Sequence, residues 1–195
     1  MEKQTKKIVI LVANPVKTSF SYACGDAYEE SARASGAAVR RFNIDEMDFD
    51  PALHQGYDVI QELEPDLVAF QEAVTWADHL VFIYPNWWNT MPAKMKGVFD
   101  RSFLPGFAFK FVNNRFTPLL KGKSARVINV VGSTHPLVLR LLIGSYTNEL
   151  SHGVLRICGV RPVRTQCFGP SRSSTEKMRK RWLQKVRAIA AREVR

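Results

Sequence analysis

The 195-residue sequence has little of what marks secreted, disulfide-stabilised or membrane-spanning proteins. Its three cysteines, Cys24, Cys158 and Cys167, are odd in number and match no metal or redox spacing, which indicates free thiols in a reducing compartment. No apolar run approaches the roughly 20 residues that cross a bilayer. The first apolar run meets Asn14-Pro15 too early for a signal peptide. We therefore expect a cytoplasmic protein with a single domain over residues 1–195.

Two common nucleotide-binding motifs are also missing. The sequence contains neither G-x-G-x-x-G nor the Walker lysine, which argues against a dinucleotide-binding Rossmann turn and a P-loop. The histidines show no ligand-like spacing, so we predict no metal site. These four residues are His54, His79, His135 and His152.

The net charge of +10 is concentrated near the C-terminus. Residues 161–195 contain 11 Lys and Arg against 2 Asp and Glu, whereas residues 45–78 contain ten acids and no Lys or Arg. A basic end suits a nucleic acid, an anionic membrane or an acidic protein, but it is also typical of a solvated helix face. No DNA- or RNA-reading motif accompanies the charge, so we predict no nucleic-acid partner.

What the sequence does contain is an alternation of strand and helix patterns. Strands are expected over 8–13, 38–44, 79–84, 125–131 and 163–168. Helices are expected over 22–34, around 63–74, from 92 to about 103, and over 137–158 with breaks at Gly144 and Gly153. A last helix follows a capping box of Ser173 and Glu176, and residues 45–61 and 105–118 are expected to be loops.

This alternation predicts an α/β fold with a five-stranded parallel sheet in the order 2-1-3-4-5 and helices on both faces. In such sheets a ligand binds at the carboxyl ends of the central strands, where the order of the strands reverses. The loops after the first, third and fourth strands are therefore the candidate site.

The loop after the first strand is rich in hydroxyl groups. Thr18, Ser19 and Ser21 lie at the start of a helix, where free amides and the helix dipole favour an anion such as a phosphate. The alternative is that Ser19 simply caps the helix.

The loop after the third strand contains two adjacent tryptophans, Trp87 and Trp88, which are difficult to explain as core residues. Flanked by backbone amides, they suit a flat aromatic ligand, although an interface or a core plug is the alternative. In the loop after the fourth strand, Gly132-Ser133 allows close approach of the backbone to a ligand. The alternating phenylalanines between 103 and 111 indicate a pocket wall, an oligomer interface or a buried hairpin.

The segment from Tyr84 to Phe109 carries a longer pattern: YP-x-x-W-x-x-x-PA-x-x-KG-x-x-DR-x-F, followed by GFAF. With Thr18-Ser19-Phe20 and the LRICG segment at 155–159, it resembles the signature of the NAD(P)H dehydrogenase (quinone) family, which has a flavodoxin-like fold. The family includes mammalian quinone reductases, bacterial modulators of drug activity and ancillary subunits of potassium efflux systems.

The resemblance implies a bound flavin, FMN or alternatively FAD, with NAD(P)H as co-substrate. Thr18, Ser19, Phe20 and Ser21 would hold the phosphate, and Gly132 and Ser133 would cover one edge of the ring. The ring itself would be bordered by Pro85, Asn86, Trp87, Trp88 and Asn89. Phe109 and Phe111 would line the substrate pocket of the partner subunit in a homodimer.

Some family features are changed here. Asn14 stands where many members have His, and Val130-Val131-Gly132-Ser133 replaces Thr-Thr-Gly-Gly. The Tyr and His relay of mammalian members has no clear match; Tyr146 is nearest and is our catalytic candidate, a structural Tyr being the alternative. The chain is short and offers no evident adenine site, so we favour FMN.

The resulting hypothesis is a ping-pong NAD(P)H oxidoreductase whose acceptor is a quinone or a similar molecule, azo and nitro compounds included. The alternative is a flavin-binding regulatory subunit that contacts a membrane potassium efflux protein through its basic end. A flavodoxin-type single-electron carrier is a third option, but such carriers are usually acidic and this chain is basic.

Overall fold

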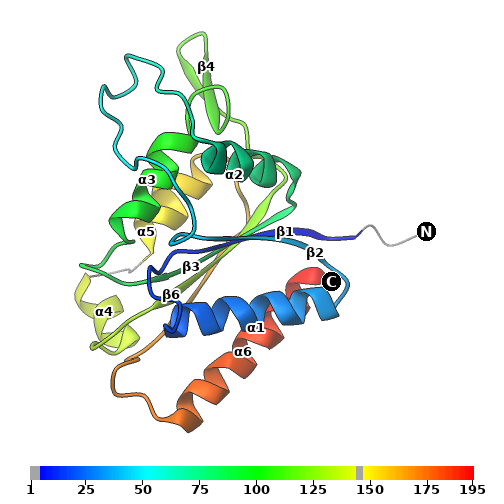
Figure 1. Ribbon diagram of the computed structural model, residues 1–195, viewed down its shortest axis with the longest axis vertical. Coiled ribbons are helices and arrows are strands. Elements are labelled where there is room, and N and C mark those ends of the chain that lie inside the picture. Colours follow the sequence, from blue (N-terminus) through cyan, green and yellow to red (C-terminus); the bar gives the residue numbers. More distant parts are fainter. Residues whose placement is uncertain (1–4, 144–146) are drawn as a thin grey trace.

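Five parallel strands form the central sheet, which lies between two layers of helices (Figure 1). The computed structural model describes residues 5–143 and 147–195. The sheet strands are β1 (Lys7–Val12), β2 (Ala38–Asn43), β3 (His79–Pro85), β6 (Ser124–Val130) and β7 (Val163–Phe168).

The helices divide between the two faces of this sheet. On one face lie α1 (Phe20–Ala34) and α6 (Glu176–Val194), and on the other α2 (Pro65–Trp76) and α3 (Ala93–Ser102) (Figure 1). Three shorter helical segments follow β6: α4 (Pro136–Ile143), α5 (Asn148–Leu150) and the π-helical turn η1 (Ser151–Arg156). None of the helices in the described parts of the chain is long and apolar enough to cross a membrane.

The apolar runs of the sequence form strands because both faces of the sheet are covered. In β1, Ile8 and Ile10 pack with α1 and α6, whereas Val9 and Leu11 pack with α2 and α3. All four side chains are at most 1% exposed. Two hydrophobic cores result, one on each face.

The strand order is β2-β1-β3-β6-β7, all parallel. Counting only the strands of this sheet, the order is the predicted 2-1-3-4-5, and the predicted fold class is confirmed. The numbers differ because two further strands precede β6 in the chain. The order reverses between β1 and β3, so the carboxyl ends of these strands border a natural crevice.

The prediction of a loop over 105–118 was wrong, because the extra strands lie in this segment. β4 (Phe109–Val112) and β5 (Arg115–Pro118) form an antiparallel hairpin that projects from the body of the molecule (Figure 1). Its turn residues Asn113 and Asn114 have φ of 50° and 59°, the backbone that a two-residue hairpin turn requires and that asparagine tolerates. Phe109 and Phe116 stack across the strands with ring centroids 5.0 Å apart.

Two helix predictions also need correction. The expected helix over 137–158 is divided into α4, α5 and η1, and Gly153 lies inside η1 instead of ending a helix. The N-cap of α6 is Thr175, whose hydroxyl accepts a hydrogen bond from the Met178 amide at 3.2 Å, and not Ser173. Ser174, between Ser173 and the N-cap, donates to the Ser171 carbonyl at 2.7 Å and so belongs to the loop that precedes α6.

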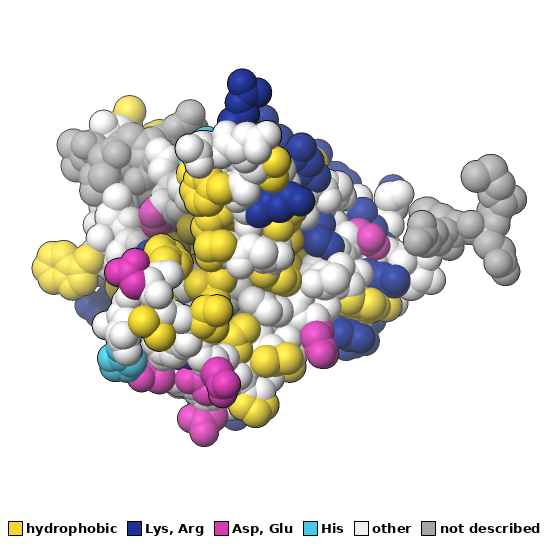
Figure 2. All heavy atoms as spheres, turned by 90° about the horizontal axis from the view of Figure 1, so that it is seen from above, with side chains coloured by type: hydrophobic (Ala, Val, Ile, Leu, Met, Phe, Trp, Pro, Cys, Tyr) yellow, Lys and Arg dark blue, Asp and Glu magenta, His cyan; other side chains and the backbone are white. Residues whose placement is uncertain are grey.

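The acidic segment 45–61 contains no helix or strand, as predicted, and Arg101 of α3 anchors it. The Arg101 side chain is 1% exposed and donates to both Glu64 carboxylate oxygens, at 3.1 and 2.9 Å, and to the Glu62 carbonyl at 2.7 Å. Arg101 also donates to the Asp50 carbonyl. Figure 2, seen from above Figure 1, shows hydrophobic side chains in a band across this end of the molecule, with acidic groups concentrated on one side.

Candidate functional site

A cavity of about 770 Å³ lies where the loops after β1, β3 and β6 meet. These loops converge because all parallel strands end at the same edge of the sheet. Backbone hydrogen bonds tie them together: the Ala13 amide donates to the Ile83 carbonyl at 2.8 Å, and the Asn86 amide to the Val130 carbonyl at 2.8 Å. The cavity is lined by Asn14, Ser19, Phe20, Ser21, Pro85, Asn86, Trp87, Trp88, Val130, Val131, Gly132, Ser133, Thr134, Ser171 and Arg172.

The β1 loop places the N-terminus of α1 against the cavity. Ser19 is the N-cap, and its hydroxyl accepts from the Tyr22 amide at 3.4 Å, so Ser19 does cap the helix. Buried Asn14 shapes the loop, because its Oδ1 accepts from the Val16 amide at 2.9 Å and its Nδ2 donates to the Ser21 hydroxyl at 3.4 Å. The amides of the first helical turn have no intrahelical acceptor and therefore favour an anionic ligand here.

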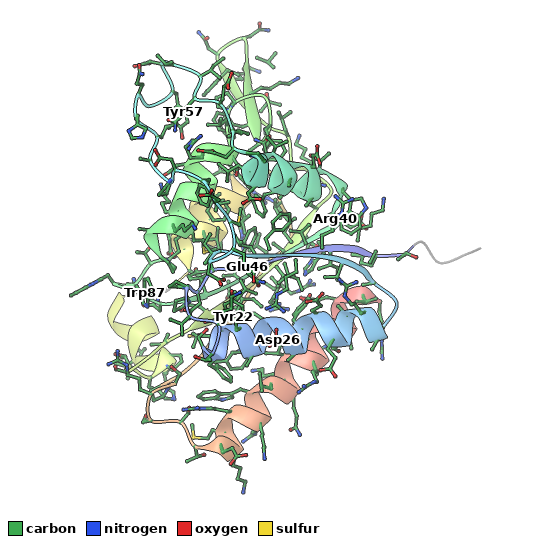
Figure 3. All side chains as sticks on the ribbon, in the orientation of Figure 1. Tyr22, Asp26, Arg40, Glu46, Tyr57 and Trp87 are labelled. Carbon is green, nitrogen blue, oxygen red and sulfur yellow. The ribbon has the colours of Figure 1, made fainter. Side chains whose placement is uncertain are left out.

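The β3 loop displays the tryptophans from a closed turn. Trp87 and Thr90 exchange two backbone hydrogen bonds of 3.0 Å, and Trp88 and Asn89 between them have φ of 52° and 61°. Trp88 is 100% exposed and Trp87 is 46% exposed. Figure 3 shows Trp87 at the end of the molecule where α4 lies, clear of the core. A large apolar surface is thus held open at the cavity by a turn of defined geometry.

The β6 loop is joined by a neighbour that was not predicted from the sequence. Ser171 and Arg172 follow β7, and their amides donate to the Val131 and Gly132 carbonyls at 2.8 and 2.9 Å. The two loops approach so closely that a Cβ at Gly169 would lie 2.8 Å from the Val131 oxygen. The predicted strand order could have identified Ser171 and Arg172, since the loop after the fifth strand must lie beside the loop after the fourth.

The cavity lining is electropositive. Arg172 is the one charged side chain among the lining residues, and it joins the α1 N-terminus in favouring negative charge. A cavity with this charge at one part and two exposed indoles at another suits a ligand that is both anionic and aromatic.

Asn86 connects the lining to polar groups that do not line the cavity. Its Nδ2 donates to Oδ1 of the fully buried Asn129 at 3.3 Å. On β3, the Tyr84 hydroxyl donates to Glu149 at 3.4 Å. Burial raises the pKa of Glu149, and burial together with the Glu149 charge raises the pKa of Tyr84. Burial also raises the pKa of Cys167 to about 12, so its thiol stays protonated and is a poor nucleophile at neutral pH.

Most of the predicted cofactor residues line this one cavity: Ser19, Phe20, Ser21, Pro85, Asn86, Trp87, Trp88, Gly132 and Ser133. Thr18 and Asn89 belong to the same loops but are not in the lining. Phe109 and Phe111 lie on β4, outside the cavity of their own chain. Tyr146 lies outside the described residues. The lining residues without a predicted ligand-binding role are Asn14, Val130, Val131, Thr134, Ser171 and Arg172.

Comparison with known proteins gives one family match and several relatives. The family model described as "Flavodoxin-like fold" matches residues 6–189. The ribosyldihydronicotinamide dehydrogenase (quinone) of Rattus norvegicus is 26% identical over 212 residues, covering 94% of this chain and 92% of the relative. The FMN-dependent NADH:quinone oxidoreductase 3 of Bacillus anthracis is 27% identical over 149 residues, covering 66% and 71%.

Among solved structures, the NAD(P)H:quinone oxidoreductase from Methanothermobacter marburgensis superimposes with a TM-score of 0.81. It is 26% identical in sequence, and the match covers 97% of each chain. The likeness therefore extends over nearly the whole length of both chains.

Proposed function

The chain belongs to the family with the flavodoxin-like fold, and from this premise we propose that it is a flavin-dependent NAD(P)H oxidoreductase with a quinone or a similar acceptor. The observation that carries the proposal is the 770 Å³ cavity, in which a helix N-terminus, Arg172 and two exposed tryptophans meet. The relatives named as quinone oxidoreductases support the same activity.

The residues of the cavity fit FMN. The first turn of α1, with the Ser19 and Ser21 hydroxyls, would hold the phosphate, and Arg172 adds a cation on the side of the β6 loop. Trp87 and Trp88 offer an apolar wall for the ring. The short β6 loop at Gly132 leaves the backbone accessible, since a Cβ there would meet no atom within 3.5 Å. A relative named as FMN-dependent supports FMN over FAD.

A bound flavin supplies hydride transfer between NAD(P)H and an acceptor, and the protein contributes binding and electrostatics. The exposed indoles of Trp87 and Trp88 would orient a flat ring by stacking against it. The backbone amides of Gly132 to Thr134 and the exposed Arg172 guanidinium supply positive charge at the β6 side of the cavity. Such groups stabilise negative charge that develops next to them.

One site used in turn by donor and acceptor implies ping-pong kinetics. The acceptor would replace the nicotinamide at the open side of the cavity, where Trp88 is wholly exposed. We expect parallel double-reciprocal plots when NADPH is varied at several fixed concentrations of a soluble quinone. Intersecting plots would contradict the shared site.

The first experiment is spectroscopic. Purified protein is reconstituted with FMN or with FAD, freed of excess flavin, and titrated anaerobically with NADPH and then with a quinone. Retention of FMN absorbance, bleaching by NADPH and recovery with the quinone are expected. Failure to retain either flavin would exclude the catalytic role and leave a scaffold for binding other proteins.

A further inference from the structure

A second cavity, about 380 Å³, lies at the opposite edge of the sheet. It is formed at the amino ends of the strands and the last turn of α6, on the side of the molecule where β1 begins and α6 ends (Figure 1). It shares no residue with the first cavity. Its lining consists of Lys6, His79, Ser124, Arg126, Pro162, Arg164, Arg192 and Glu193.

The lining has an excess of positive charge: four Lys and Arg side chains face a single carboxylate. That carboxylate, Glu193, already has hydrogen-bond donors within the protein. It accepts two hydrogen bonds from Arg126 at 3.0 and 2.5 Å and one from the Tyr28 hydroxyl at 2.8 Å, and His79 Nε2 lies 3.3 Å away. Within residues 5–143 and 147–195, no ion pair neutralises Lys6, Arg164 or Arg192.

The sheet register brings two of these cations together. Arg126 on β6 is paired with Arg164 on β7, and neighbouring positions of paired strands project from the same face. Like charges side by side in a sheet destabilise it. Other basic side chains of α6 have acidic partners. Arg187 pairs with Glu30 at 3.1 Å, and Lys180 pairs with Glu176 at 2.7 Å. Glu193 offsets the charge of Arg126, whereas Arg164 has no acidic partner among the described residues, so a negative ligand beside it would supply one.

Arg126 is also held in place. It is 9% exposed, and its Nε and Nη2 are used by Glu193 while it lines the cavity. A guanidinium fixed in this way loses little freedom when it binds a ligand. Lys6, Arg164 and Arg192, which are more exposed, would complete the site from three other segments.

We propose that this second cavity binds a small phosphate-bearing anion with at least two negative charges, through Lys6, Arg126, Arg164 and Arg192. Arginine forks match phosphate oxygens in geometry and charge. The volume lies at the small end of ligand pockets, which suits a compact anion of pyrophosphate size. The proposal does not depend on flavin binding at the first cavity.

The test is a calorimetric titration of the full-length protein with inorganic pyrophosphate at about 0.15 M salt. Saturable binding is expected, weakened roughly tenfold or more in the Arg164→Gln/Arg192→Gln double variant, because charged hydrogen bonds are lost. The Arg126–Glu193 pair stays intact in this variant. Lys6 lies outside the sheet strands and α6, so we expect Lys6→Gln to weaken pyrophosphate binding without changing the stability of the fold.

Two controls identify the site. Arg115→Gln removes an exposed charge on the distant hairpin and should leave the affinity unchanged. Arg172→Gln should weaken only the binding of pyrophosphate at the first cavity and leave its affinity for the second cavity unchanged. No binding at all, equal weakening by Arg115→Gln, or binding that is lost in Arg172→Gln but kept in the double variant would each overturn the proposal.

Discussion

Trp88 is a wholly exposed side chain at positive φ, so its ring contributes nothing to the core of the chain. We expect Trp88→Ala to leave the free energy of unfolding nearly unchanged but to raise the Kd for FMN. Loss of an aromatic contact worth about 0.5–1.5 kcal/mol corresponds to a roughly 2- to 13-fold weaker complex and lower turnover.

Fluorescence titration with FMN measures this effect. Tyr57→Ala is the matched control, because Tyr57 is 65% exposed on the acidic segment and does not line the cavity. Unchanged FMN affinity and turnover in Trp88→Ala would remove the tryptophan from the proposed site.

Arg101 is the opposite case, a charged side chain that the fold buries. Its four acceptor atoms belong to Asp50 in the acidic segment and to Glu62 and Glu64 just before α2, so the guanidinium ties this stretch of chain to α3. We expect Arg101→Ala to lower the free energy of unfolding by about 3–5 kcal/mol, the usual cost of breaking a buried pair. Urea denaturation measures the change.

Lys96→Ala is the comparison on the same helix. Its ion pair with Asp100 is solvent-exposed, and such pairs contribute about 0–1 kcal/mol. Equal destabilisation by the two variants would show that Arg101 does not anchor the segment.

At the scale of the element, the end of α6 is held by a single carboxylate. The Glu193 side chain is 6% exposed and accepts hydrogen bonds from Arg126 on β6 and Tyr28 on α1, and His79 Nε2 on β3 lies 3.3 Å from it. Burial alone would raise the pKa of Glu193, but the close approach of His79, the hydrogen bonds from Arg126 and the charges of both lower it to about 2.

Because the folded pKa lies below the ordinary value, Glu193 stabilises the fold fully above about pH 4.5 and loses this effect as the pH falls to about 2. The contribution is on the order of 3 kcal/mol. We expect Glu193→Gln to destabilise the protein at neutral pH and to flatten its stability between those pH values. Urea unfolding at a series of pH values tests this.

Glu176→Gln serves as the control, since Glu176 lies in the first turn of the same helix and pairs with Lys180 in solvent. If the acid limb of the Glu193→Gln stability profile matched that of the wild type, other carboxylates would be responsible for it.

At the scale of the whole molecule, exposed apolar side chains indicate that the chain does not act alone. Phe111 and Phe116 on the hairpin are 64% and 41% exposed, and Leu137 and Leu141 on α4 are 55% and 76% exposed. Apolar surface of this kind marks an interaction site. We propose a homodimer in which the hairpin of one chain reaches the cavity of its partner.

Sedimentation equilibrium should give twice the 22.2 kDa of one chain. The Phe111→Ser/Phe116→Ser variant should shift the protein toward the monomer and reduce turnover, whereas Met178→Ser on α6 should do neither. A monomeric wild-type protein would contradict the shared site.

The pattern of apolar and polar residues along the sequence was sufficient to predict much of this architecture. Strands buried on both faces are continuous apolar runs, as in Ile8–Val12, and handedness rules leave few ways to order them. Because Trp87 and Trp88 directly follow the third strand of the sheet, their place in the chain predicts that they lie at the ligand-binding edge. The hairpin was predicted only as a buried alternative to a loop, because its strands are short and mostly exposed and therefore lack a burial pattern.

By itself the sequence determined the sheet, its order and the loops that form the first cavity, because each depends on side-chain periodicity and on where a strand ends. Only the tertiary structure decided which distant groups meet. Arg172 reaches the cavity because β7 lies beside β6, and Glu193 meets Arg126 across 67 positions of the chain. Such pairs have no local signature, since the helix and strand periods say which face a residue occupies but not what faces it.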